Sequence, residues 1–290
     1  MKIAIAAAAG NVGSRIARQL QHNPDIELIL LGNNLSSLKN LKIDNAKLIS
    51  TDISDILQVE KATKDVNALF WMVPPVLNTL SLKNWYERVT KAGINAVKNN
   101  SIERVVLLSC LGAGSKENLG TVTYSGYMEQ DFDKLNTNIL ALRPGYFMEN
   151  LLLQQSSILN KGYFSFTYSG SHRIPFISTD DIGDAASHYL SYNEWSGKWK
   201  LNLMGPENIT PFEIANRISK VLNKNIKYTQ ISISEVDEDL KNSGINSVVI
   251  DELKELFIAL GDPQGVYNTP RTYEAQTNTS LEEFIKLKLC

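Results

Sequence analysis

A strand-to-helix turn near the N-terminus constrains this chain more than any other feature. Residues 2–7 read KIAIAA, an apolar run typical of a buried strand, and residues 11–22 have the period of an amphipathic helix. The loop Ala7-Ala8-Ala9-Gly10-Asn11-Val12-Gly13 connects them. A glycine-bearing turn in this position lets backbone N–H groups approach a pyrophosphate at the helix N-terminus. The loop therefore predicts dinucleotide binding, and a tight turn without a ligand is the alternative.

Short apolar runs alternate with segments of helical period along the first half of the chain. Strands are expected at residues 2–7, 27–31, 47–51, 67–73, 103–109 and 138–142. Helices are expected at 11–22, 55–63, 79–99 and 124–136. Such alternation is typical of a parallel sheet covered on both faces. It predicts an α/β fold, a Rossmann-type doubly wound parallel sheet whose ligand lies beyond the C-terminal ends of the strands.

The regular alternation fades after Arg143-Pro144-Gly145. Further helices are expected near residues 146–160, 180–192, 211–223 and 247–260. We expect residues 1–150 to form the dinucleotide-binding domain and residues 151–290 a smaller α+β substrate lobe. Because no Ser/Gly/Pro linker divides the chain, the lobe is expected to pack on the first domain rather than fold independently.

Charge and cysteine usage exclude several classes of function. The net charge is −2 with lysines and arginines scattered, so no basic stripe predicts nucleic-acid binding. No uncharged stretch is long enough to span a membrane. Cys110 and Cys290 have neither the spacing of a disulfide framework nor that of a metal site. The N-terminal apolar run is read as a strand rather than an export signal, because a glycine loop and a charged helix follow it, so a soluble cytoplasmic protein is expected.

Several segments carry a family resemblance. They are AAAAGNVGSRIARQL at 6–20, ALFWMVPP at 68–75 and, most specific, LRPGYFMENLL at 142–152. The C-terminal half adds IPFISTDDIGDAA at 174–186, GPENITPFEIANRIS at 205–219 and RTYEAQTNTSLEEFI at 271–285. Together they resemble the NmrA-like branch of the atypical short-chain dehydrogenase/reductases. The resemblance implies a Rossmann fold, NADP(H) or sometimes NAD(H) in the cleft, and either reduction of quinone-like or carbonyl substrates or redox sensing without turnover.

The resemblance also implies roles for individual residues. Gly10, Asn11, Val12 and Gly13 would hold the pyrophosphate. The path from adenosine to nicotinamide would be lined by Met72, Val73 and Pro74, and the nicotinamide would be bordered by Pro144, Gly145 and Phe147. The chain departs from the family at Ala7, Ala9 and Gly32, where a glycine, a threonine and an arginine are usual. These departures weaken the expectation of NADP(H) over NAD(H).

The segment after the second expected strand usually decides between the two cofactors, with an acid for NAD and an arginine for NADP. Here it reads Gly32-Asn33-Asn34 and gives neither signal. Asn33 is a candidate ribose or phosphate contact, and Asp52, after the third strand, a candidate adenine contact. An ordinary loop and helix cap explains these polar residues equally well.

Carbonyl reduction needs a proton donor, and many short-chain enzymes use a serine followed by Tyr-x-x-x-Lys. Ser109 ends the fifth expected strand, and Tyr124 is the candidate tyrosine. Four residues later stands Met128, which can neither bind ribose hydroxyls nor tune a phenol. Standard tyrosine–lysine catalysis is therefore not expected.

Other polar and aromatic residues have two interpretations each. Cys110 is interpreted as a buried small hydrophobe rather than a reactive thiol. A surface carboxylate is the interpretation for Glu129, a cap of the following helix for Glu149, and a solvated loop residue for His172. The segment 163–168 contains four aromatic residues, Tyr163, Phe164, Phe166 and Tyr168. They either line the bottom of an apolar pocket or indicate a half-buried strand.

The leading hypothesis is an NAD(P)H-dependent oxidoreductase that reduces a small flat acceptor such as a quinone or carbonyl compound. A non-catalytic NAD(P)-binding redox sensor is the alternative. Met128 and the departures of the loop from the family pattern favour it. Sugar epimerase or dehydratase chemistry is a third, and the missing Tyr–Lys pair argues against it. A small-molecule substrate is expected as partner, no metal is expected, and a homodimer is left open.

Overall fold

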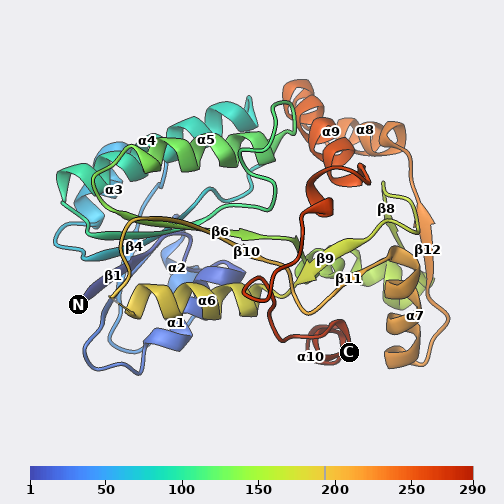
Figure 1. Ribbon diagram of the computed structural model, residues 1–290, viewed down its shortest axis with the longest axis horizontal. Helices are drawn as coiled ribbons and strands as arrows, with labels where there is room; N and C mark the ends of the chain where they lie inside the picture. Colours follow the sequence, from blue (N-terminus) through green and yellow to red (C-terminus); the bar gives the residue numbers. More distant parts are fainter. Residues whose placement is uncertain (193, 290) are drawn as a thin grey trace.

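A seven-stranded parallel sheet with helices on both faces forms the larger part of the molecule. The computed structural model describes residues 1–192 and 194–289. The strand order is β10-β6-β5-β4-β1-β2-β3, and every pairing within this sheet is parallel. In Figure 1, α3, α4 and α5 cover one face of the sheet and α1, α2 and α6 the other. This confirms the doubly wound α/β fold.

The strands of this sheet lie where the apolar runs predict them, with one addition. The edge strand β10 was not predicted, because its sequence KWKLNL lacks the continuous apolar run of the other strands and its first three residues are exposed. The strands are β1 (Lys2–Ile5), β2 (Glu27–Gly32), β3 (Lys47–Ser50), β4 (Ala68–Met72), β5 (Arg104–Leu108), β6 (Asn138–Pro144) and β10 (Lys198–Leu203).

The helices on the two faces agree with the predicted ranges within about three residues. The short helix α2 was not predicted, and the Asn34 side chain caps it by accepting from the N–H groups of Ser36 and Ser37. The helices are α1 (Asn11–Leu20), α2 (Leu35–Lys39), α3 (Ile56–Ala62), α4 (Leu82–Asn99), α5 (Thr121–Asp133) and α6 (Thr179–Ser191).

The predicted helix at 146–160 is confirmed in part: residues 148–161 are helical, but mostly with 3₁₀ and π geometry rather than as a regular α-helix. Residues Tyr146–Phe147 form the short strand β7, which pairs with β9 (Ile174–Ile177). A 3₁₀ turn over Met148–Gln154 and a π turn over Ser157–Lys161 follow. The pairing of β7 with β9 holds the start of the segment extended, so a regular α-helix cannot begin there.

The remaining chain builds a smaller lobe around its own hydrophobic cluster. Two small sheets and four helices make this lobe, with α8 and α9 above it and α7 and α10 below in Figure 1. Helices α8 and α10 were not predicted. The elements are β8 (Tyr163–Phe166), β11 (Asn208–Ile209), α7 (Pro211–Leu222), β12 (Lys227–Gln230), α8 (Ile233–Asn242), α9 (Ser247–Gly261), the 3₁₀ turn Val266–Asn268 and α10 (Leu281–Lys288).

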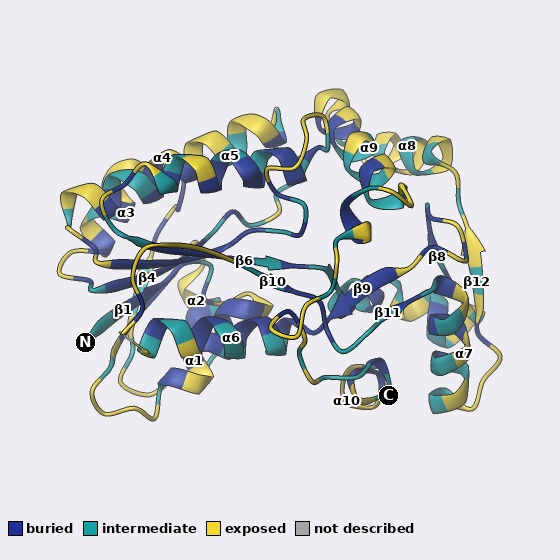
Figure 2. Cartoon of the chain, viewed as in Figure 1, coloured by how far each residue is buried: buried dark blue, intermediate teal, exposed yellow. Residues whose placement is uncertain are grey.

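Burial follows this architecture. In Figure 2 the strands of the large sheet are mostly buried, and each covering helix exposes its outer face. One hydrophobic cluster lies on the α4 and α5 face of the sheet, a second lies on the α1 and α6 face, and the third fills the smaller lobe. Among the described residues, no helix combines the length and hydropathy needed to cross a bilayer.

The larger sheet is not built from the first 150 residues only. Strand β10 pairs with β6 along its whole length, and α6 packs on α1. Gly183 makes this helix contact close, because a Cβ there would lie 2.6 Å from the Arg15 Cβ. The division at residue 150 stays a prediction, and both α6 and β10 complete the first layer from beyond it.

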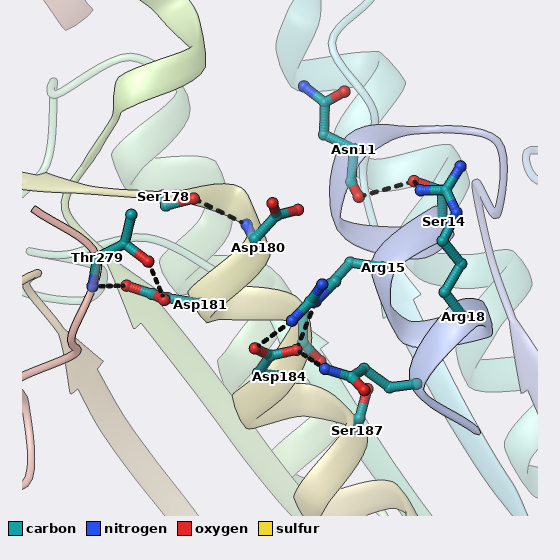
Figure 3. A network of polar contacts seen from close by, with 12 residues as sticks. Asn11, Ser14, Arg15, Arg18, Ser178, Asp180, Asp181, Asp184, Ser187 and Thr279 are labelled. Carbon is teal, nitrogen blue, oxygen red and sulfur yellow. Dashed lines mark hydrogen bonds and ion pairs between the residues drawn. The ribbon is translucent and has the colours of Figure 1, made fainter. Parts of the chain in front are cut away.

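A polar network fastens α1 to α6 (Figure 3). Asp184 accepts from Arg15 Nε at 2.6 Å and from Arg15 Nη2 at 2.8 Å, and Gln19 adds a third hydrogen bond. The N-terminal turn of α6 is held in turn by the C-terminal segment, because Thr279 donates its N–H and hydroxyl to Asp181. Arg15 is thus engaged in holding two helices together.

Candidate active site

The loop after β1 has the close approach that a pyrophosphate site requires. Ala7 adopts a left-handed conformation with φ of 50°, and its carbonyl oxygen accepts from the Gly10 N–H at 2.9 Å. A Cβ at Gly13 would lie 2.6 Å from the Ala7 oxygen and 2.8 Å from the Ala8 Cα. Gly13 is therefore required for α1 to pack against the end of β1, which is the part the third glycine of such loops plays.

The first turn of α1 offers unpaired donors to an anion. No side chain caps this helix, and its first turn carries no acidic residue. The N–H groups of Asn11, Val12 and Gly13 have no acceptor among the described residues, as expected for the first turn of a helix. These donors and the helix dipole fit the pyrophosphate of a dinucleotide. When bound, such a cofactor supplies a hydride from its dihydronicotinamide.

The residues expected near the adenosine are largely occupied by local structure. Asp52 accepts from both the N–H and the hydroxyl of Ser54, and Asp55 caps α3. Asn33 is exposed, and its carbonyl oxygen accepts from the Ser50 hydroxyl. Adenosine contacts of Asn33 and Asp52 remain predictions.

A cavity of about 650 Å³ lies beside the C-terminal ends of β4, β5 and β6. The predicted nicotinamide-side residues Met72, Val73, Pro74, Pro144, Gly145 and Phe147 all line it, as does Ser109. Its opposite walls come from the smaller lobe, chiefly from β8 and α9. None of the lining residues in the described chain is Asp, Glu, Lys, Arg or His. The cavity is therefore uncharged and mostly apolar.

The α5 residues that line this cavity are not those of the Tyr-x-x-x-Lys pattern. Thr121, Val122 and Ser125 line the cavity, whereas Tyr124 does not. The Tyr124 hydroxyl donates to Glu252 of α9 at 3.1 Å. Burial, and then the charge of Glu252, raise the pKa of Tyr124. Met128 is buried in the hydrophobic cluster on the α4 and α5 face of the sheet.

Glu252 has its own structural role at this wall. Its carboxylate accepts from the Leu82 N–H at 2.6 Å, the Lys83 N–H at 2.9 Å and the Ser81 hydroxyl at 2.9 Å. An acid at a helix N-terminus satisfies orphan donors and the helix dipole together. Glu252 thereby fixes α9, and with it one cavity wall, to the start of α4.

The Ser109 side chain is fixed by a hydrogen bond to the buried carboxylate of Glu129. Its hydroxyl donates to Glu129 Oε1 at 2.5 Å, and Arg143 donates to the same carboxylate at 2.9 Å and 2.5 Å. Glu129 is 2% exposed, so its interpretation as a surface carboxylate is wrong. Its spacing of four from Ser125 places it on the cavity-facing side of α5, a signal present in the sequence.

Two further residues behave as structural groups. His172 is buried, and its Nε2 lies 2.9 Å from the Leu260 carbonyl oxygen, so its interpretation as a solvated residue is wrong. Burial lowers its pKa. Glu149 does act as a cap, but of α6 rather than of the segment after it, because it accepts from the N–H and hydroxyl of Thr179.

Cys110 lines the cavity beside Ser109. Burial raises the pKa of its thiol to about 12, and a hydrogen bond with Ser125 only partly offsets that effect. Since the thiolate is the nucleophile, the geometry agrees with a small apolar residue rather than a reactive thiol.

Both interpretations of the aromatic segment hold for part of it. Tyr163 is exposed and Phe164 is fully buried, as in a half-buried strand. Phe166 and Tyr168 line the cavity. Tyr146 packs against both, with ring centroids 5.4 Å from Phe166 and 6.4 Å from Tyr168. The lobe thus supplies an aromatic wall facing the ends of the strands.

Comparison with known proteins agrees with the loop and the fold. Residues 7–149 match the model of an NAD(P)H-binding family. An NAD(P)H azoreductase of Xenophilus azovorans is 21% identical over 98% of this chain and 96% of its own length. Festuclavine synthase II of Penicillium roqueforti is 33% identical over 60% of each chain.

Two solved structures show the same fold over almost the whole chain. An NADPH-dependent quinone oxidoreductase of Escherichia coli, complexed with NADPH, has a TM-score of 0.78 at 20% identity and covers 98% of this chain and 99% of its own. The triphenylmethane reductase of Citrobacter sp., complexed with NADP(H), has a TM-score of 0.80 at 17% identity and covers 99% of both chains.

Fold and loop together define an NAD(P)H-binding Rossmann protein. Within that class, residues 7–149 match the NAD(P)H-binding family, and the whole chain has the fold of the quinone oxidoreductase and the triphenylmethane reductase. This match and this fold agree with the resemblance seen in the sequence.

Proposed function

We propose that this protein is an NAD(P)H-dependent reductase of small, flat, uncharged acceptors, with quinones as the first class to test. The observation that carries the proposal is the uncharged, largely apolar cavity at the C-terminal edge of the sheet. Ligands of doubly wound sheets bind at this edge. Aromatic walls suit a planar ring, and a few hydroxyls suit its oxygens.

The same cavity argues against sugar-nucleotide substrates. A nucleoside diphosphate brings two negative charges that require cationic or donor groups when they are desolvated. No described cavity-lining residue carries a positive charge. The names of the relatives, an azoreductase and a quinone oxidoreductase, support reduction of an aromatic acceptor.

NADP(H) is proposed as the cofactor in preference to NAD(H). The support is the NADPH and NADP(H) named in the two solved complexes. The segment at Gly32-Asn33-Asn34 carries no acid that would repel a 2′-phosphate.

The test is oxidation of NADPH and NADH, followed by absorbance, with a neutral naphthoquinone and with its sulfonated counterpart. The two acceptors share the ring and differ in charge. We expect turnover with NADPH and the neutral quinone, and at least about tenfold lower kcat/KM for the sulfonate, because its charge finds no partner in the cavity. Equal kcat/KM for both would contradict the argument from the cavity.

A redox sensor without turnover is the second candidate. Two observations favour it: the Tyr124 hydroxyl is committed to Glu252, and Met128 is buried in the core. Cofactor binding by calorimetry without oxidation on any quinone would select the sensor.

A further inference from the structure

One tyrosine hydroxyl lies in the polar corner of the cavity, and no sequence pattern points to it. Tyr86 is contributed by α4, half-buried, and lines the cavity. Its phenol lies near the side chains of Ser125 and Thr121, which are the polar residues of α5 among those that line the cavity. Ser125 also reaches the Cys110 thiol, next to Ser109. The corner therefore gathers hydroxyls from two helices at the end of β5.

Other tyrosines of the cavity are placed differently. Tyr146 and Tyr168 pack among Phe166 and Phe176 in the aromatic wall of the smaller lobe. The Tyr124 ring lies 5.8 Å from the Tyr86 ring, but its hydroxyl is committed to Glu252. Of the pair of rings between α4 and α5, Tyr86 is the one that lines the cavity.

We propose that Tyr86 is the proton donor to the acceptor oxygen, in the place that a tyrosine of α5 has in related enzymes. This inference rests on the proposed reductase function. The proton donor would then come from the neighbouring helix α4, and the Ser125 and Thr121 side chains lie near enough to the phenol to lower its pKa.

The proposed reaction transfers a hydride from the cofactor and a proton from Tyr86 to the quinone. A quinone takes two electrons and one hydrogen as hydride from the cofactor, and the charge this leaves on its oxygen is met by the Tyr86 proton. The phenol O–H bond breaks, and an O–H bond forms on the acceptor. The phenolate regains a proton from water at the cavity mouth, and Ser125 and Thr121 stabilise it by hydrogen bonding. The hydride hydrogen and the Tyr86 proton are together the two hydrogens of the hydroquinone, so the acceptor needs no further proton.

The pKa of Tyr86 is consistent with a donor that stays protonated. Burial raises it to about 12, while the Ser125 and Thr121 hydroxyls lower it in part. Turnover that depends on this group is therefore not expected to fall between pH 6 and about pH 9 through loss of the Tyr86 proton.

The first test is equilibrium binding and needs no turnover. Menadione and methylnaphthalene share a fused ring system, and only menadione has carbonyl oxygens. In the NADP⁺ complex of the wild-type protein we expect menadione to bind more tightly, and Tyr86→Phe to reduce that preference about three- to tenfold, the size of one neutral hydrogen bond. Affinity for methylnaphthalene should not change.

The second test is kinetic, with three tyrosine variants. Tyr86→Phe is expected to lower kcat for quinone reduction about 10- to 100-fold with NADPH affinity unchanged. Tyr127→Phe is the matched control, because it removes the same atom from an exposed site whose hydroxyl meets Glu117. Tyr124→Phe is the rival: a larger loss there than in Tyr86→Phe would move the donor back to α5 and overturn the proposal.

The remaining outcomes are also decisive. Wild-type kcat and wild-type menadione preference in Tyr86→Phe would overturn the assignment of Tyr86 while leaving the reductase function standing. A wild-type protein that binds menadione through Tyr86 but never oxidises NADPH would reject the reductase function and the proton transfer, and retain only the hydrogen bond.

Discussion

Ala7 occupies the backbone position at which phosphate-binding loops of this kind usually have their first glycine, and the structure shows what alanine costs there. With φ of 50° the residue lies in the left-handed region, where a Cβ crowds the following carbonyl oxygen. Since Ala7 is an L-residue, the sequence predicts that the loop adopts a conformation that such a residue tolerates. The observed conformation of Ala7 is allowed but strained.

Ala7→Gly should therefore stabilise the protein by about 1 kcal/mol, since relief of this strain outweighs the added freedom of the unfolded chain. Urea unfolding measures the change. Ala9→Gly is the matched control: Ala9 has no positive φ, so glycine there should destabilise slightly. Destabilisation by Ala7→Gly would show that the turn is not strained.

A lysine in place of Met128 would recreate the Tyr-x-x-x-Lys pattern with Tyr124, so this position can be tested by substitution. The side chain is 1% exposed and packs in the core. Met128→Lys should destabilise the fold by at least about 3 kcal/mol through burial of an unpaired charge, and should not raise activity. Met128→Leu keeps the volume and should cost less than about 1.5 kcal/mol. A gain in kcat in Met128→Lys would contradict the placement of α5.

These residues also show what sequence reasoning could and could not find. The loop, Pro144 and Gly145 were located by local chemistry and resemblance, because a turn needs glycine whatever surrounds it. Glu129 and His172 were misjudged, because burial of a polar side chain depends on partners distant in sequence: Ser109 for Glu129, Leu260 for His172. Tyr86 gave no local signal, since its role depends on how α4 and α5 pack.

Among the elements, those of strong apolar period were predicted and those fixed by contacts were not. Strand β10 has no continuous apolar run and is recognised by its pairing with β6. The segment 146–160 has helical composition, but β9 holds its start extended. Tertiary contacts override local preference at both places.

The α1–α6 contact gives a pH-dependent prediction. Burial alone would raise the pKa of Asp184, but hydrogen bonds from Arg15 and Gln19 outweigh it, and the net pKa is lowered. A carboxyl group whose pKa is lowered by folding stabilises the protein at pH values above its unfolded-state pKa of about 3.9. This stabilisation is lost as the pH falls through the folded-state pKa.

Asp184→Asn should then destabilise by about 1 kcal/mol at pH 7, a modest figure because both partners are about one-third exposed or more. The difference from wild type should shrink below about pH 4 and vanish once Asp184 is protonated. Unfolding free energies measured across this range test the sign. A difference that stays constant with pH would show that the ion pair is not its source.

For the whole molecule, the smaller lobe and the larger sheet depend on each other. The cavity takes its walls from both, and Glu252 joins α9 to the start of α4. A chain ending at residue 150 lacks α6 and β10, so the α1 face of the sheet is only partly covered and β6 becomes an open edge.

We expect this truncated chain to show no cooperative thermal transition and to bind the dye ANS, as a chain with exposed apolar surface does. The full-length protein is the control, and added NADPH should raise its Tm by mass action. Cooperative unfolding of the truncated chain would show that the first 150 residues fold independently.

The late position of β10 also affects the growing polypeptide. At about 5 to 20 residues per second, several seconds separate synthesis of β6 from synthesis of its outer neighbour, followed by passage through the ribosome. During that interval β6 presents unpaired N–H and C=O groups that could pair with another chain. Chaperone dependence and aggregation during expression should therefore respond to substitutions in residues 198–203, even though none of these residues lines the cavity.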